Sequence, residues 1–278
     1  MASVMAQTSS EQVTSGPVWR KRTTRQELAL WLGWLVLIAF FIFCWQVMTK
    51  TTIWAFVYDA PRQALDIGSR MFPPRWEYLP NLLEPLWDTI AIATLGTLLA
   101  LFMAVPVAFL AARNTTPSTR FVRPVALLII VSSRSINSLI WALLLVAIIG
   151  PGVMAGIVAI AFRSIGFVSK LLYEAIEEID AVQVEAVSAT GASKAQIMDY
   201  AVVPQILPAF AGITVFRWDI NIRESTVLGL VGAGGLGLRL QESLNVLAWP
   251  QVTLIFILIL ITVLVSEWVS AKVRHAII

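Results

Sequence analysis

The sequence predicts an all-α protein that crosses a membrane several times, and two observations support this prediction. First, 58% of its 278 residues are hydrophobic and only 13% are charged, whereas a soluble domain carries about a quarter charged residues. Second, the charge-free intervals 28–49, 89–112 and 243–266 are each 22 or more residues long, and about 20 apolar residues suffice for a helix to cross a bilayer. We therefore predict a polytopic protein of the lipid bilayer.

The first span is expected at 28–49, as an anchor helix that is retained in the protein. Four basic residues precede it between positions 20 and 25, and lysine and arginine in short loops mark the cytoplasmic side. A cleaved signal sequence is disfavoured because the apolar stretch is too long and lacks a small-residue cleavage site. The stretch 50–88 that follows is expected outside the cell and contains five prolines with mixed charges.

Five further spans complete the predicted topology of six transmembrane helices. They are expected at about 88–112, 124–149, 153–173, from 205 onward, and 250–271. Basic residues follow the second span and the last span, so both chain ends are placed in the cytoplasm. The expected divisions are a tail at 1–27, the anchor helix and external loop at 28–84, a core at 85–272 with a cytoplasmic loop at 174–204, and a tail at 273–278.

Residue types that carry enzyme chemistry are sparse. The only cysteine, Cys44, lies in the first apolar segment, and the only histidine, His275, lies in the C-terminal tail. We therefore expect no internal disulfide, no metal site and no catalytic residue. The basic residues are spread between apolar segments, which argues against nucleic-acid binding. No G-x-x-x-x-G-K-[ST] sequence occurs, so this chain is expected to bind neither ATP nor another cofactor itself.

The cytoplasmic loop carries the most informative motif. The segment EAVSATGASKAQIMDYAVVP at 185–204 resembles the signature loop of ABC importer permeases, which reads E-A-A, three residues, G, nine residues, I-x-L-P. The fixed residues in register are Glu185, Ala186, Gly191 and Pro204, and the departures, all small or apolar, are Val187, Ala201 and Val203. Segments 133–152 and 217–237 are similar to the phosphonate-type subfamily, and the resemblance covers about 85–272.

The resemblance implies the type I ABC importer permease fold in a bacterial cell membrane. It also implies several partners: an ATPase dimer that binds ATP and Mg²⁺, an extracytoplasmic substrate-binding protein, and a second permease that is identical or homologous. Coupling to the ATPase is assigned to Glu185, Ala186 and Gly191. The loop composition favours two short helices broken at Gly191, where glycine permits a sharp backbone turn.

Several polar and charged side chains are expected at depth in the membrane, where each charge costs at least about 2.5–3.5 kcal/mol. Those assigned to a translocation pathway are Arg134, Asn137, Arg163, Arg217, Asp219, Asn221, Arg223 and Glu224. Helical spacing places Arg217, Asn221 and Glu224 on one stripe, and places Asp219 and Arg223 roughly opposite. One stripe could line the pathway while the other holds the helix to its neighbours. Structural ion pairs are the alternative.

The four arginines of this set outnumber its two acidic residues. The excess favours an anionic cargo, because guanidinium groups match phosphoryl-type oxygens in bidentate geometry. Together with the resemblance, this predicts ATP-driven import of phosphonate, phosphite or phosphate by alternating access. Two alternatives stay open: the same architecture importing another small solute such as methionine, and a membrane-embedded enzyme acting on a phosphorylated lipid.

A glycine-rich segment, VGAGGLG at 231–237, matches the letters of a dinucleotide-binding fingerprint. Such a site requires a parallel sheet and an acidic residue about 20 positions further on. The residues at 255–260 are instead wholly apolar, and the topology places the glycines on the external side. We predict that Gly232, Gly234, Gly235 and Gly237 form a packing element at an outer gate, where glycine lets helices approach closely.

Overall fold

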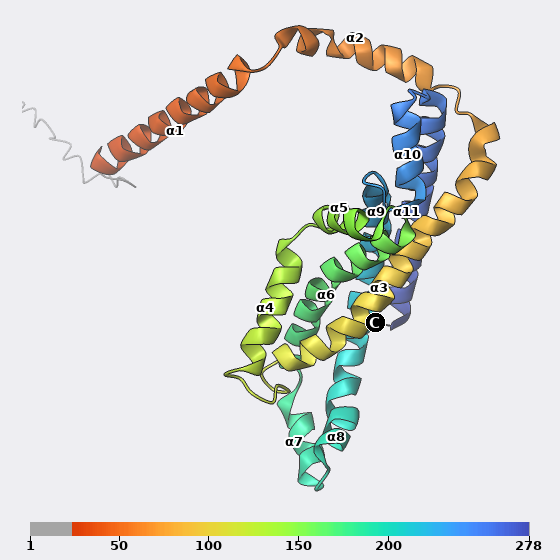
Figure 1. Ribbon diagram of the computed structural model, residues 1–278. Helices are drawn as coiled ribbons and strands as arrows, with labels where there is room; N and C mark the ends of the chain where they lie inside the picture. Colours follow the sequence, from red (N-terminus) through yellow and green to blue (C-terminus); the bar gives the residue numbers. More distant parts are fainter. Residues whose placement is uncertain (1–23, 278) are drawn as a thin grey trace, which may run out of the picture. The chain divides into compact units, whose positions relative to one another are not determined.

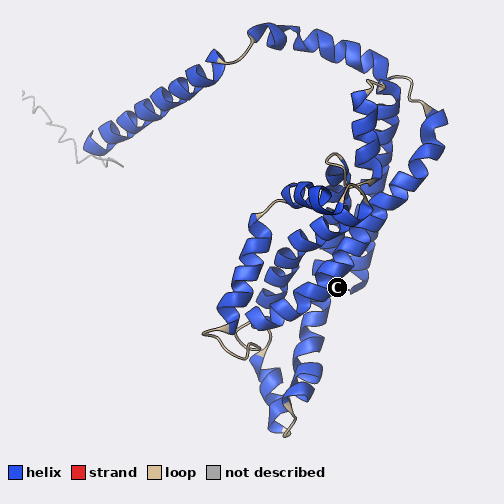
Figure 2. Cartoon of the chain, viewed as in Figure 1, coloured by secondary structure: helices blue, strands red, loops and turns tan. Residues whose placement is uncertain are grey.

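The computed structural model describes residues 24–277, and every regular element in this range is helical (Figures 1 and 2). The predicted all-α class is confirmed. The elements are α1 (Thr24–Lys50), α2 (Trp54–Met71), the 3₁₀ turn η1 (Trp76–Leu82), α3 (Leu83–Ala111), α4 (Val122–Ser135), α5 (Ser138–Ile149), α6 (Val153–Glu177), α7 (Ala181–Ala189), α8 (Lys194–Ile197), the π-helical η2 (Met198–Val202), α9 (Val203–Gly229), α10 (Gly235–Asn245) and α11 (Trp249–Ile277). Arg25 of the basic cluster lies at the start of α1, and the rest of the cluster lies outside the described residues.

The chain divides into two compact units, with the division between Gln63 and Ala64. The first unit contains α1, a helix whose side chains are almost all exposed in the single chain. The second unit holds the packed core, which includes residues upstream of the expected boundary at 85. Leu82 in η1, for example, is fully buried with Leu236 and Leu254.

Within residues 24–277, five stretches are long and apolar enough to cross a membrane: 25–50, 76–111, 153–177, 194–229 and 249–276. A sixth candidate is the pair α4 and α5, which together meet the same criteria but bend by 88° where they join. Length and composition therefore agree with six spans. The expectation of one helix over 124–149 is wrong, since this span is two helices.

The break between α4 and α5 has a local cause. Ile136 adopts an extended backbone conformation after α4, and the side-chain oxygen of Asn137 accepts a hydrogen bond from the Leu139 N–H at 3.0 Å. Asparagine in this position is an effective N-cap, because it satisfies a donor that the first helical turn leaves free. Asn137 thus begins α5 as a new helix in a new direction.

The centre of the core is α6, which packs against α3, α4, α5 and α9. Its closest neighbour is α3, whose buried face is a stripe of small residues at spacings of three and four: Ala93, Gly96, Ala100, Ala104, Ala108 and Ala111. A Cβ atom at Gly96 would lie 2.7 Å from Ile160 Cγ2. Small side chains let two membrane helices approach closely enough for dispersion contacts to hold them together.

The stretch 50–88, expected as an external loop, contains the helix α2. Its five prolines gave no indication of a helix there. Pro61 lies inside α2. The fifth span also differs, since the helix does not begin near Gln205 but continues from Lys194. Pro204 occupies the first turn of α9, as expected, and the preceding turn widens into η2, where the Val203 N–H bonds to the Met198 carbonyl. A π-type turn accommodates a proline ring that would otherwise clash with the carbonyl four residues earlier.

Candidate functional site

The polar residues predicted at depth gather where α9 crosses α3, α6 and α11. Arg217, whose side chain is 3% exposed, donates from Nε to Ser164 Oγ at 2.9 Å and forms an ion pair with Glu224 at 3.3 Å. Its guanidinium also lies over the Phe167 ring, with Cζ 5.1 Å from the centroid. These contacts satisfy a charge that would be costly to bury alone. Arg217 is therefore held inside this chain by a hydroxyl group, a carboxylate and an aromatic ring.

Asn221, one turn further along α9, is fully buried. Its amide donates to Thr97 Oγ1 at 2.7 Å and to Ser164 Oγ at 3.1 Å, and so connects α9 to α3 and α6. The nearby Trp218 Nε1 donates to Thr94 Oγ1 at 3.0 Å. Three helices are thus joined by hydrogen bonds between side chains. Sequence reasoning missed Thr94, Thr97 and Ser164, because single hydroxyl residues in an apolar span look like ordinary small side chains.

Asp219 faces the other side of α9, as the helical spacing predicted. Ser266 Oγ donates to it at 2.7 Å from α11, and Arg223 pairs with its second carboxylate oxygen. Asp219 is buried, whereas half of the Arg223 side chain is exposed. This group attaches α9 to α11 and leaves the Arg223 guanidinium accessible.

Arg134 and Arg163 lie at the break between α4 and α5. The Nη1 atom of Arg163 donates to the carbonyl oxygens of Arg134 and Ile136. These carbonyls belong to the last turn of α4 and the residue after it, where the helix leaves its acceptors without partners. A cation is also favoured beside the negative end of the helix dipole. Arg163 therefore stabilises the broken span from the neighbouring helix α6.

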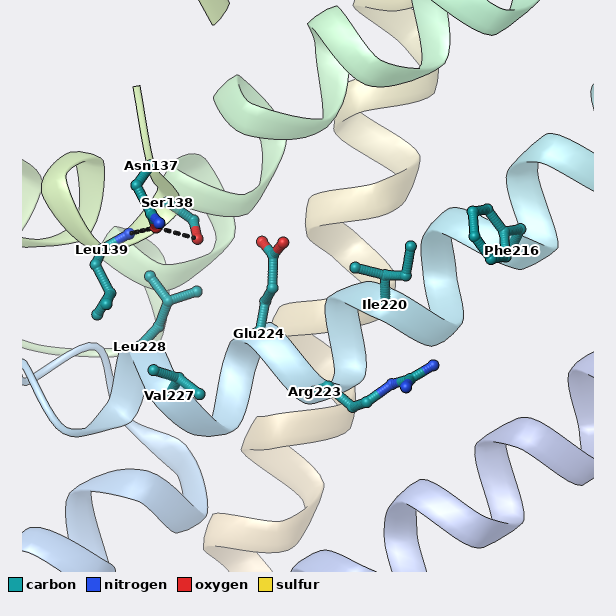
Figure 3. Close-up of a pocket in the computed structure, with 9 residues that line it drawn as sticks. All are labelled: Asn137, Ser138, Leu139, Phe216, Ile220, Arg223, Glu224, Val227 and Leu228. Carbon is teal, nitrogen blue, oxygen red and sulfur yellow. Dashed lines mark hydrogen bonds between the residues drawn. The ribbon is translucent and has the colours of Figure 1, made fainter. Parts of the chain in front are cut away.

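A cavity of about 580 Å³ opens between α9 and the turn that joins α4 to α5. It is lined by Asn137, Ser138, Leu139, Phe216, Ile220, Arg223, Glu224, Val227 and Leu228. Figure 3 shows the Glu224 side chain projecting from α9 into this space, whereas Arg223 extends in a different direction. The cavity thus combines apolar walls with an amide, a hydroxyl and two ionisable groups, which is the composition of a small polar ligand site.

The charges around this region do not balance. Glu224 pairs with Arg217, and Asp219 pairs with Arg223. Arg134 and Arg163 form no ion pair with any carboxylate among residues 24–277. The Arg163 guanidinium, which bonds to the carbonyls before Asn137, and the exposed Arg134 side chain are therefore left without a carboxylate counter-ion. The structure brings the eight predicted pathway residues into one region of the core; that they line a pathway stays a prediction.

The loop predicted to couple to an ATPase lies at one end of the core, where α7 and α8 project beyond the ends of α4 and α6 (Figure 1). The two helices are separated at Gly191, as expected, and this glycine has a φ of +80°. Glu185 and Ala186 lie on α7 and are exposed. A shallow cavity of about 440 Å³, lined by residues including Val187, Gly191 and Tyr200, lies between the two helices. The segment presents an accessible surface; its coupling role stays a prediction.

The base of this loop is tied firmly to the core. Glu177, at the end of α6, accepts the Arg113 N–H at 2.9 Å and forms an ion pair with Arg123 at 3.4 Å. The Asn114 amide donates to the Ile176 carbonyl, and the Gln205 side chain accepts the Asp180 N–H at 2.9 Å. These contacts connect the segment at the base of α7 to the ends of α3, α4, α6 and α9.

The glycine-rich segment joins α9 to α10 at the opposite end of the core from α7. No strand precedes it in the described chain, so the arrangement differs from a dinucleotide site. Gly232, Gly234 and Gly235 all have positive φ values. A Cβ atom at Gly229 would lie 2.6 Å from the Gly237 Cα, and one at Gly237 would collide with the Thr226 carbonyl oxygen. Of the four predicted glycines, Gly237 packs α10 closely against α9, and Gly229 belongs to the same contact. The Cβ positions of the other three face residues outside α9: Val146 and Pro151 for Gly232, Val153 for Gly234, and Thr89 for Gly235.

The same segment contacts two other helices. The Gly152 N–H donates to the Gly232 carbonyl at 3.0 Å, and the Leu236 N–H donates to Thr89 Oγ1 at 2.8 Å. Close packing against α3 and α6 is thus observed. Action as a gate stays a prediction. Cys44 and His275 lie far apart in the sequence, and no group of three metal-ligating side chains occurs in the part of the chain that the structure describes.

Comparison with known proteins adds to this geometry. Residues 96–271 match the family described as the binding-protein-dependent transport system inner membrane component. The chain is 38% identical over 233 residues to the phosphite transport system permease protein PtxC of Stutzerimonas stutzeri, covering 83% of each protein. It is 40% identical over 217 residues to the phosphate-import permease protein PhnE of Mycolicibacterium smegmatis, covering 78% of this chain and 41% of that protein.

A solved structure shares the fold. The inward-facing MetNI methionine ABC transporter matches with a TM-score of 0.64 and 21% identity, covering 73% of this chain and 99% of the matched chain. At this level of identity the likeness concerns the backbone arrangement alone. The type I importer fold expected from the sequence is confirmed.

Proposed function

Since the chain belongs to the inner membrane components of binding-protein-dependent transport systems, we propose that it is the permease subunit of an ATP-driven importer for phosphonate-like oxyanions. The observation that carries this proposal is that Arg134 and Arg163, at the break between α4 and α5, form no ion pair with any carboxylate among residues 24–277. An anion moving past the α4–α5 turn would meet this excess of positive charge. The names of the two relatives, a phosphite and a phosphate permease, support the same class of cargo.

The proposed pathway runs along the cavity between α9 and the α4–α5 turn. Asn137 would donate from its amide to the oxyanion, and Arg223 would offer a guanidinium that Asp219 holds in place. Interaction with several weak donors suits transport, because cargo that binds tightly at one point is not released. Selection of the cargo at high affinity would then belong to a separate extracytoplasmic binding protein.

A second permease, identical or homologous, would complete the pathway. The residues that line the cavity come from only two places, the α4–α5 turn and α9. A two-fold related subunit facing them would supply the opposite wall, and two-fold symmetry is the commonest arrangement of such pairs. Each permease would bind one ATPase subunit through α7, with ATP and Mg²⁺ held by the ATPase. In this arrangement both chain ends lie in the cytoplasm.

Two other functions are less well supported. Import of methionine by the same architecture has support from the fold of the methionine transporter, but that likeness is at 21% identity. A membrane enzyme acting on a phosphorylated lipid would need an acid–base or nucleophilic group placed beside the arginines. Glu224 is the acidic residue lining the cavity, and it is paired with Arg217. Membership of a transport family favours the permease.

The decisive experiment is uptake into proteoliposomes that contain the permease, its ATPase and its binding protein. Phosphonate, phosphite and phosphate are compared with methionine as cargo, and Arg134→Ala is compared with native protein. Arg120→Ala is the matched control, because Arg120 is also exposed and also forms no ion pair with a carboxylate in the described chain. We expect oxyanion uptake to fall about tenfold or more with Arg134→Ala, the effect of losing one charged hydrogen bond. Native uptake by Arg134→Ala, or uptake of methionine alone, would overturn the proposal.

A further inference from the structure

The helix α2 has an apolar face that the proposed function does not use. Successive residues of an α-helix are about 100° apart, so the polar side chains of α2 fall within roughly 120° of its circumference. These polar residues are Asp59, Arg62, Gln63, Asp66, Ser69 and Arg70. The rest of the circumference carries the large apolar side chains Trp54, Phe56, Val57, Leu65, Ile67 and Met71. Such complete separation of the two kinds of side chain is the pattern of an amphipathic helix.

No residue of α2 is buried. As whole residues, Phe56 is 66% exposed and Leu65 is 77% exposed. With four charges in 18 residues, α2 also fails the criteria for a membrane span. The helix is therefore too polar to cross a bilayer and too apolar on one face to be left in water.

The expected topology places the end of the α1 span and the start of the α11 span on the same, external side of the membrane. The N-terminal end of α2 follows the α1 span after three residues, 51–53. At its C-terminal end, the Met71 carbonyl accepts a hydrogen bond from Thr253 Oγ1 at 2.9 Å, in the first turns of the α11 span. The Arg75 N–H donates to the Pro250 carbonyl at 3.2 Å, at the start of the same span. With that topology, a helix attached at both ends to these spans would run along the external membrane surface.

We propose that α2 is an interfacial helix, which lies flat in the membrane surface on the side opposite α7 with its apolar face in lipid. Trp54 and Tyr58 stand at one edge of the apolar face, with ring centroids 6.3 Å apart. Tryptophan and tyrosine are enriched at this depth of a bilayer, because each has an apolar ring and a polar group. Their position at the edge of the apolar face is the one expected for a helix at the level of the headgroups.

The charges on the polar face of α2 indicate whether the helix binds through anionic headgroups or through the apolar interior of the bilayer. Its two aspartates and two arginines cancel in net charge. Asp66 and Arg70 form an ion pair at 2.9 Å, and the Gln63 amide donates to Asp59 at 2.9 Å. Interfacial helices that bind through anionic lipid carry an excess of lysine and arginine on the polar face. We infer that α2 is held by burial of its apolar side chains, so that zwitterionic lipid suffices.

The test uses the full chain in phosphatidylcholine vesicles, with Cys44→Ser as background and one environment-sensitive fluorophore attached to a single new cysteine. Ala64→Cys and Val57→Cys place the label at the centre of the apolar face. Ala55→Cys is the matched control, because it makes the same substitution in the same helix on the polar side. Quenching by brominated lipid and by aqueous iodide is measured for each label, and gel filtration confirms that each variant retains the native size.

We expect labels at positions 57 and 64 to be quenched severalfold more by brominated lipid than the label at 55, with iodide giving the reverse order. The contrast should persist unchanged when anionic lipid is added or the salt concentration is raised. Iodide quenching that is equal at all three positions would place α2 in water and overturn the proposal. Labels at 57 and 64 that neither agent reaches would show a protein partner instead. A difference in quenching between position 55 and positions 57 and 64 that appears only with anionic lipid would also contradict the proposal.

Discussion

Arg217 and Glu224 form an ion pair along α9 in which Nη2 lies 3.3 Å from Oε2. The arginine side chain is 3% exposed, whereas that of Glu224 is 24% exposed and faces the cavity beside Asn137. A charge in the packed core is thus neutralised by a carboxylate that the proposed cargo would pass. The stability of the core therefore depends on a residue, Glu224, that also lines the proposed pathway.

Removal of the carboxylate alone should therefore be more damaging than removal of both charges. Glu224→Ala leaves Arg217 buried without a counter-ion, and we expect the free energy of unfolding to fall by about 3–5 kcal/mol, the usual effect of breaking a buried pair. The double variant Arg217→Met with Glu224→Ala should recover part of this loss, because methionine fills similar space without a charge. Unfolding of the purified protein in detergent, followed by tryptophan fluorescence, measures both. Equal stability of native protein and Glu224→Ala would show that water already solvates Arg217.

The broken span should depend on Arg163. Replacing Arg163 with methionine removes two charged hydrogen bonds to the carbonyls of Arg134 and Ile136. We expect a loss of about 1.5–3 kcal/mol in the free energy of unfolding, typical of hydrogen bonds to a charged group. Arg163→Lys should lose less, since an ammonium retains the charge near the helix end but reaches fewer acceptors. The same unfolding measurement distinguishes the two variants. An Arg163→Lys variant less stable than Arg163→Met would contradict this role.

The contact between α9 and α10 should tolerate no side chain at Gly237. A Cβ atom there would collide with the Thr226 carbonyl, so the two helices must separate to admit alanine. We expect Gly237→Ala to lower the free energy of unfolding by about 1–3 kcal/mol, as overpacking does elsewhere.

Gly212 provides the control, because it lies inside α9, the other helix of this contact, and nothing stands within 4 Å of its Cβ position. Gly212→Ala should be neutral or stabilising by up to about 1 kcal/mol, the helix-propensity difference between the two residues. If both variants change stability equally, the close contact is not what Gly237 provides.

The membrane spans are the part of this fold that the sequence predicts best. Alternation of apolar runs and basic loops locates the spans, because the bilayer imposes their length. The small stripe of α3, with Ala100, Ala104 and Ala108 four residues apart, could also be recognised in the sequence. Hydropathy could not predict the break at Asn137, because both halves of the span are apolar. The residue that indicates a new helix start is Asn137 itself, an N-cap residue type placed before an apolar run.

The partners of the charged residues were less accessible to prediction. Spacing along α9 correctly placed Asp219 beside Arg223 and separated both from Arg217, since one helix defines these relations. The pairing of Arg163 with main-chain carbonyls depends on how α4 and α6 pack, and two helices distant in sequence contribute to it. Ser164 bonds to both Arg217 and Asn221, yet nothing near it in sequence marks it as different from other serines.

The turn between α7 and α8 should transmit ATPase movement only while Gly191 keeps its backbone conformation. Its φ of +80° is one that L-residues adopt at a cost of roughly 1–2 kcal/mol, and most readily as asparagine. Nothing stands within 4 Å of the Cβ position of Gly191, so the effect of substitution comes from the backbone and not from a clash.

We expect Gly191→Val to abolish most of the ATPase stimulation by loaded binding protein in the reconstituted complex, and Gly191→Asn to retain it. Ala192→Val adds bulk at the next residue, which has an ordinary φ, and should behave as native protein. If Gly191→Val and Ala192→Val reduce the stimulation equally, the loss is due to side-chain bulk at the ATPase contact and not to the left-handed backbone conformation of Gly191.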